Sequence, residues 1–206
     1  MCLSVSEKET FLQVLRQVVY LALMVGGAFV LRGLTGHYLK DTFWEFGIVE
    51  NIQLALLLLT AVWFTINAIA LKQGRGLFSL LAGICLLAAC REMDNYFAEK
   101  LPIIGWKFGY SFPLIGLAIC FRDRKQTRSS LFYFLKTPAF QMMCLVGLLL
   151  IIGETLGHRP LIENVLGTKI DSRAVRRIFE EGLELMAYLL LMLSSVECSF
   201  NFLKKK

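Results

Sequence analysis

Long apolar runs separated by short polar connections form the main pattern of this chain. The runs are close to the roughly 20 residues that an α-helix needs to cross the hydrocarbon core of a bilayer. Short segments of alternating apolar and polar residues, which mark membrane β-barrels, do not occur. Because backbone groups in lipid must be satisfied within their own segment, the pattern predicts an all-α, polytopic integral membrane protein. A bundle of about six transmembrane helices is expected in a single domain, residues 1–206, with spans at 11–31, 46–71, 77–97, 105–121, 138–156 and 178–203.

Two connections differ from the others in length and charge. The segment 122–136 is expected to be a basic loop, and 157–174 is the longest connection in the chain. Pro138 follows the basic segment at a place where the first turn of a helix accepts proline, so the fifth span is expected to begin there. The third and fourth spans are the least regular, because they are short and carry glycines and Pro113.

Composition agrees with this interpretation. Hydrophobic residues make up 56% of the chain, the mean hydropathy is +0.61, and charged residues make up 18%, below the roughly 25% of an average soluble domain. The net charge of +6 would suggest nucleic acid in a soluble protein, but here the basic residues flank apolar runs and act as topology signals. Nucleic acid is therefore not an expected partner. The six cysteines contain no CxxC pair and are interpreted as small hydrophobic residues of helix packing.

The distribution of charge predicts an orientation. With six spans, the compact basic connections and both termini fall on one side, which holds 12 of the 22 Lys and Arg residues. The positive-inside rule makes that side cytoplasmic, so both termini are expected in the cytoplasm of a cell with the chain in its inner or plasma membrane. Twelve of the 16 acidic residues then lie on the outward half. This asymmetry is independent of the Lys and Arg count, and it predicts that the functional site lies on the outward side of the membrane.

The end of the third span carries the most unusual residues. The run Leu77 to Cys90 is too short to cross a bilayer, and completing it draws Arg91, Glu92, Asp94 and Asn95 to the membrane boundary. Ionisable groups at that depth are costly, so they line a cavity, pair with one another or take part in chemistry. Two interpretations of these residues remain open. One is an ion pair within the helix, and the other is an anion bound by Arg91 beside a carboxylate that acts as acid and base.

The second and sixth spans bring further polar residues to the same side. Glu50 and Gln53 lie three residues apart on one helix face, although acids also suit the start of a helix. Glu181 and Glu184 share a stripe with Tyr188, and Arg177 can pair with Glu181 at a spacing of four.

Glu154 and His158 lie four residues apart at the end of the fifth span. This spacing suits a weak metal site or an acid–base pair, but a histidine is also favoured at a helix C-terminus. No complete metal motif or phosphate-binding glycine loop is present, and the sequence identifies no cofactor. At the other side of the membrane, Glu197 is expected either to pair with Arg16 or to contact a partner protein.

The leading hypothesis is an inner-membrane protein with an outward, acid-rich cavity that binds or passes a small cation or engages a lipid headgroup. A membrane-embedded enzyme acting on a lipid or lipid-linked substrate is the alternative, with Glu92, Asp94, Glu181 or Glu184 as acid and base. A third possibility is a subunit or sensor of a membrane complex. Membrane lipids are the expected partners, and a homo-oligomer is compatible with the sequence. The cavity-lining candidates are Glu50, Gln53, Arg91, Glu92, Asp94, Asn95, Glu154, His158, Glu181 and Glu184.

Overall fold

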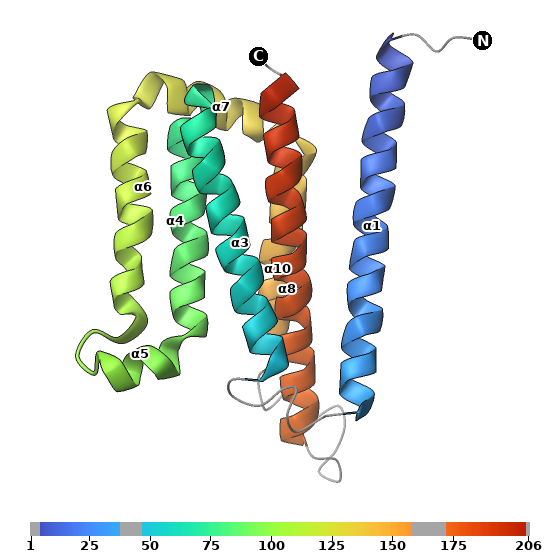
Figure 1. Ribbon diagram of the computed structural model, residues 1–206, viewed down its shortest axis with the longest axis vertical. Helices are drawn as coiled ribbons and strands as arrows, with labels where there is room; N and C mark the ends of the chain where they lie inside the picture. Colours follow the sequence, from blue (N-terminus) through green and yellow to red (C-terminus); the bar gives the residue numbers. More distant parts are fainter. Residues whose placement is uncertain (1–4, 38–46, 158–171, 205–206) are drawn as a thin grey trace.

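The structure is a computed structural model that describes residues 5–37, 47–157 and 172–204. Nearly all of these residues are helical and none forms a strand, which confirms the all-α prediction for the described chain. The elements, drawn in Figure 1, are α1 (Val5–His37), α3 (Ile48–Ala70), η1 (Lys72–Gly74), α4 (Arg75–Glu92), α5 (Asp94–Lys100), η2 (Gly105–Tyr110), α6 (Ser111–Arg122), α7 (Arg124–Phe134), α8 (Pro138–Gly157) and α10 (Ser172–Lys204).

Five helices in the described residues are long and apolar enough to cross a membrane, and a bent pair raises the number to six at most. The five are Phe11–Val30, Ile48–Ala70, Lys72–Glu92, Pro138–Thr155 and Arg177–Leu203, close to five of the expected spans. The bent pair joins α5 to η2 and α6 at an angle of 106°. Gly105 opens η2 with a φ of +55°, a conformation that residues with a Cβ rarely adopt. The helix α8 begins at Pro138, as expected.

The expected end of the third span is wrong. Instead of continuing to residue 97, α4 ends at Glu92, Met93 forms a turn, and α5 begins at Asp94. The polar residues after Cys90 have no apolar face to bury, and an acid in the first turn favours a new helix start. Phe97 of α5 packs edge-on against Phe108 of η2, with ring centroids 4.8 Å apart. In Figure 1, α5 consequently lies across one end of the bundle.

The expected basic loop is also wrong, because residues 124–134 form the helix α7. Ser130 and Phe134, four residues apart, are its buried side chains, so one face packs while the basic residues stay outside. The Gln126 amide donates a hydrogen bond of 2.8 Å to the carbonyl oxygen of Lys72, and the Ser130 hydroxyl donates to that of Gln73. In Figure 1, α7 runs across the end of the bundle opposite α5.

Glycines allow α4 and α6 to approach closely. A Cβ added at Gly116 would lie 2.6 Å from the Leu80 Cα, and one added at Gly83 would lie 2.6 Å from the Phe112 carbonyl oxygen. Elsewhere the core is aromatic: Phe78 of α4 contacts Phe64 of α3 and Phe202 of α10, with ring centroids 6.1 and 5.0 Å apart. These contacts tie α3, α4, α6 and α10 into one packed unit.

The N-terminal helix α1 lies beside this unit and packs mainly on α10 (Figure 1). Of its described side chains, only those of Arg16, Tyr20 and Met24 are partly buried, together with Gly27. Spacings of four, four and three residues place these positions on one stripe of a helix. Apart from Gln13 and Gln17, the remaining residues of α1 between 11 and 30 are apolar and exposed, which suits a helix surrounded by lipid.

Candidate functional site

The structure brings together the polar ends of α3, α4 and α10 at the end of the bundle where α5 lies. We name this group the polar cluster. It consists of side chains from three helices that contact one another in pairs, namely Glu50 and Gln53 of α3, Arg91 and Glu92 of α4, and Arg177, Glu181, Glu184 and Tyr188 of α10.

Gln53 is the most deeply buried member of the polar cluster, with no exposed surface. Its amide nitrogen donates hydrogen bonds to the backbone oxygen of Glu181, at 3.1 Å, and to Oε2 of the same residue, at 3.2 Å. The other oxygen of that carboxylate, Oε1, lies 3.8 Å from Arg177 Nε. Arg177 also lies 3.8 Å from Glu50, so it joins α3 to α10.

On the α4 side, each polar residue contacts α10. The Tyr188 hydroxyl donates a hydrogen bond of 2.7 Å to Glu92 Oε1. Arg91 Nη2 lies 3.6 Å from Glu184 Oε1, an ion pair too long for a good hydrogen bond. The Arg91 side chain remains 58% exposed while that of Glu184 is 10% exposed. Several of the five guanidinium donors of Arg91 are therefore directed away from Glu184.

A groove of about 680 Å³ opens beside Arg91 and Glu184, between α4 and η2 on one side and α8 and α10 on the other. One part of the groove is apolar, and the other carries charges and aromatic hydroxyl or indole groups. The apolar part is formed by Ile84, Leu87 and Ala88 of α4 with Leu150 and Ile151 of α8. The polar part is formed by Arg91, Glu154, Glu184 and Tyr188, with Trp106 and Tyr110 of η2 beside them.

The predicted site residues separate into three groups. Arg91, Glu154 and Glu184 line the groove, whereas Glu50, Gln53, Glu92 and Glu181 belong to the polar cluster without lining it. Asp94 and Asn95 lie exposed on α5, and Arg91 pairs with Glu184 of another helix instead of with Asp94. His158 lies outside the described residues, so the proposed pairing of Glu154 with His158 stays a prediction.

Glu154 lines the groove with an exposed side chain and forms no hydrogen bond or ion pair with any described residue. Across the described part of the chain, no group of three or more His, Cys, Asp and Glu side chains is arranged to hold a metal ion.

Sequence reasoning missed the aromatic wall of the groove. Trp106 and Tyr110 lie close together, with ring centroids 5.6 Å apart, and both line the groove. Trp and Tyr gather where a membrane meets water, and these two fall at the start of a short, irregular apolar run. An aromatic pair at the start of an irregular apolar run was therefore the sequence feature that could have predicted this wall.

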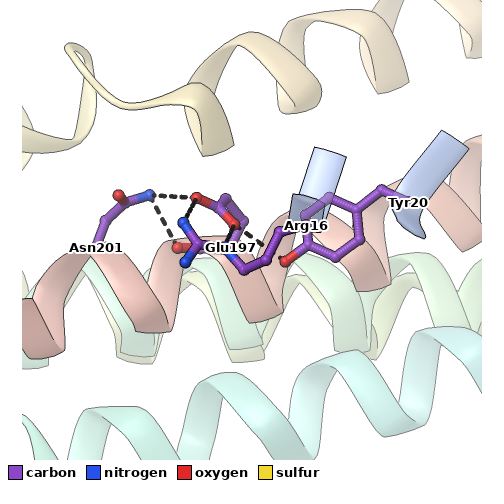
Figure 2. Close-up of polar contacts among 4 residues, drawn as sticks. All are labelled: Arg16, Tyr20, Glu197 and Asn201. Carbon is purple, nitrogen blue, oxygen red and sulfur yellow. Dashed lines mark hydrogen bonds and ion pairs between the residues drawn. The ribbon is translucent and has the colours of Figure 1, made fainter. Parts of the chain in front are cut away.

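A second polar site joins α1 to α10, as Figure 2 shows. Arg16 donates two hydrogen bonds to the Glu197 carboxylate, at 3.0 and 3.1 Å, and Tyr20 donates a third, at 3.0 Å. The Asn201 amide donates to the backbone oxygen of Glu197 at 2.9 Å. Of the two expected alternatives for Glu197, the pairing with Arg16 is confirmed.

Comparison of the chain with protein-family models, curated proteins and solved structures finds no match. The groove and the polar cluster therefore carry the functional inference.

Proposed function

We propose that this chain is an integral protein of the cell membrane, with both termini in the cytoplasm, whose groove binds the headgroup of a single phospholipid. The observation that carries the proposal is the division of the groove into an apolar part and a charged part. Ile84 and Arg91 lie seven residues apart on α4, which corresponds to about 10 Å along the helix axis. An amphiphile with its headgroup at Arg91 would direct its acyl chain past Ile84 toward the middle of the bilayer.

Arg91 is the group that suits a lipid phosphate. A guanidinium presents a planar fork of donors that matches the oxygens of a phosphate, and this one is held in place by a single long contact with Glu184. Glu181 and Glu92 are hydrogen-bonded to Gln53 and Tyr188, so neither forms a hydrogen bond with Arg91, although the charge of Glu92 still acts on it.

The acids at the same end favour a headgroup that also carries a positive charge. Glu154 and Glu184 both line the groove, and Glu154 forms no hydrogen bond or ion pair with a described residue. A phosphate at Arg91 would bring an attached ammonium group within the reach of these carboxylates. A zwitterionic phospholipid such as phosphatidylethanolamine meets both requirements.

The paired state of the acids argues against binding of a small cation. To bind one, Glu181 or Glu184 would have to give up its ion pair with Arg177 or Arg91, so the loss of an existing pair would offset part of the gain. Of the four acids expected for an enzyme, Glu184 alone lines the groove, so the binding function is better supported than catalysis.

Native mass spectrometry of the gently solubilised protein tests the proposal. We expect one phosphatidylethanolamine per chain to survive mild activation in the wild type and to be lost in Arg91→Gln. Arg75→Gln, at the opposite end of the same helix, is the matched control and should retain the lipid. Glu154→Gln should lower the preference for phosphatidylethanolamine over phosphatidylglycerol. Retention of lipid that is equal in wild type and Arg91→Gln would contradict the proposal.

A further inference from the structure

The helix α7 has a fixed inner face. Gln126 and Ser130 donate hydrogen bonds to the backbone of the turn that joins α3 to α4, and the Tyr133 hydroxyl donates one of 2.8 Å to the carbonyl oxygen of Asn201 in α10. Phe134 is buried beside them. These contacts hold α7 across the end of the bundle (Figure 1) and determine which of its residues face away from the bundle.

The exposed face of α7, together with Phe121 at the end of α6, places arginine side chains against exposed aromatic rings. The Arg124 guanidinium lies 5.4 Å from the centre of the Phe121 ring, and that of Arg128 lies 5.8 Å from the centre of the Phe132 ring. Phe121 is 62% exposed and Phe132 is 55% exposed. Exposed basic residues beside exposed aromatic rings suit the boundary of a membrane, where basic residues attract anionic lipids and aromatic rings lie at the level of the headgroups.

Charge is strongly unbalanced around this face. The segment 122–136 contains five basic residues and one acid, Asp123. Among the described residues, none of these five side chains forms an ion pair with an acid. The surface is therefore a concentrated positive patch without an internal counter-charge from the described chain, and its complement is an anion.

We propose that α7 is an interfacial helix whose exposed face, made of Arg124, Lys125, Arg128 and Phe132, binds the headgroups of anionic phospholipids together with Phe121 at the end of α6. Basic residues beside a membrane attract anionic lipids, and the phenyl rings enter the boundary between headgroups and acyl chains. An acidic protein or a nucleic acid would match the charges but leave Phe121 and Phe132 in water, so the lipid is the better match. The proposal shares with the proposed function only the insertion of the chain in a bilayer, and it does not depend on the groove.

The test uses the full chain in nanodiscs that contain phosphatidylcholine with a minor fraction of phosphatidylglycerol. The measured quantity is the enrichment of phosphatidylglycerol among the lipids that stay with the protein after its transfer to mild detergent. We expect the Arg124→Gln/Arg128→Gln variant to reduce this enrichment at least five-fold. The control, Lys100→Gln/Lys107→Gln, removes the same charge at the opposite end and should keep the enrichment.

Two further measurements separate charge from folding. The charge-conserving variant Arg124→Lys/Arg128→Lys should retain most of the enrichment, and 0.5 M salt should weaken it in the wild type because ions screen surface charges. Arg91→Gln should leave it unchanged, so failure of the groove proposal would be distinguishable. Equal enrichment in the glutamine variant and the wild type, or an equal loss in the Lys100/Lys107 control, would overturn the proposal. Displacement of phosphatidylglycerol by an acidic peptide or an oligonucleotide at equal charge concentration would also overturn it.

Discussion

Arg16 of α1 and Glu197 of α10 form an ion pair with two hydrogen bonds, although 181 positions separate them in the sequence. Glu197 is 2% exposed, so its charge has little access to solvent and depends on Arg16 and Tyr20. The same arginine lies 5.2 Å from the centre of the Phe200 ring. Because α1 meets α10 along one stripe, this site determines which face of α1 contacts the bundle.

Removal of Arg16 should therefore destabilise the protein and loosen α1. We expect Arg16→Gln to lower the free energy of unfolding by about 3 kcal/mol, the low end for breaking a buried pair, because the arginine is partly exposed. The measurement is the unfolding transition in mixtures of a mild detergent with sodium dodecyl sulfate. A double replacement, Arg16→Met with Glu197→Leu, should recover most of the loss because neither charge remains. If the double variant is as unstable as the single one, Arg16 does not stabilise the protein through its pairing with the Glu197 carboxylate.

Glycine at position 116 should be required for the contact between α4 and α6. A Cβ at this position meets the Leu80 backbone at 2.6 Å, which cannot move aside without a shift of the helix. We expect Gly116→Ala to destabilise the protein by about 2 kcal/mol, as overpacking of a core does. Gly147→Ala is the matched control, because a Cβ there meets nothing within 4 Å. Thermal unfolding in detergent should show no loss for the control, and equal losses would contradict the packing derived from the structure.

The hydrogen bond from Tyr188 to Glu92 should stabilise the contact between α4 and α10. Tyr188 is 5% exposed and its hydroxyl lies 2.7 Å from the carboxylate, so Tyr188→Phe leaves Glu92 without this donor. We expect a loss of about 2 kcal/mol, the usual range for a hydrogen bond to a charged group. Tyr110→Phe makes the same change at a hydroxyl that has no hydrogen bond to a described residue, and it should be neutral in the same unfolding assay.

The proposed orientation can be tested with a thiol reagent that does not cross membranes. In a background whose native cysteines are replaced by alanine, Lys100→Cys should react in intact cells, and Lys125→Cys should react after the membrane is permeabilised. The reason is that α5 and α7 lie at opposite ends of the bundle (Figure 1), and the basic end is expected in the cytoplasm. Reaction of both positions from the same side would exclude the proposed topology.

The sequence was sufficient to predict where most of the membrane-length helices lie. The length of an apolar run and the polar residues at its ends determine such a helix with little help from tertiary contacts, as at Ile48–Ala70. It was not sufficient for the end of α4, because a helix carrying Arg91 and Glu92 can either continue or turn. The packing of Phe97 on Phe108 stabilises the turned arrangement, and that contact is not local.

The helix α7 could not be distinguished from a loop for a related reason. Residues 124–130 are polar, and the periodicity of the helix gains meaning only when Ser130 contacts the turn between α3 and α4 and Phe134 joins the core. Within the site, spacing along one helix correctly suggested that Arg177 pairs with Glu181. It could not show that Arg91 pairs with Glu184, because the relative register of two helices is fixed by packing along their whole length.

Trp106 offers the most direct test of lipid binding in the groove, since it lies in the polar part beside Arg91 and Glu184. With Trp44 and Trp63 replaced by phenylalanine, its fluorescence can be followed in nanodiscs that contain a small fraction of a brominated lipid. We expect brominated phosphatidylethanolamine to quench Trp106 at fractions several-fold lower than brominated diacylglycerol, which has no phosphate. Arg91→Gln should abolish the difference. Quenching that follows the bulk fraction of either lipid, with or without Arg91, would contradict a phospholipid site in the groove.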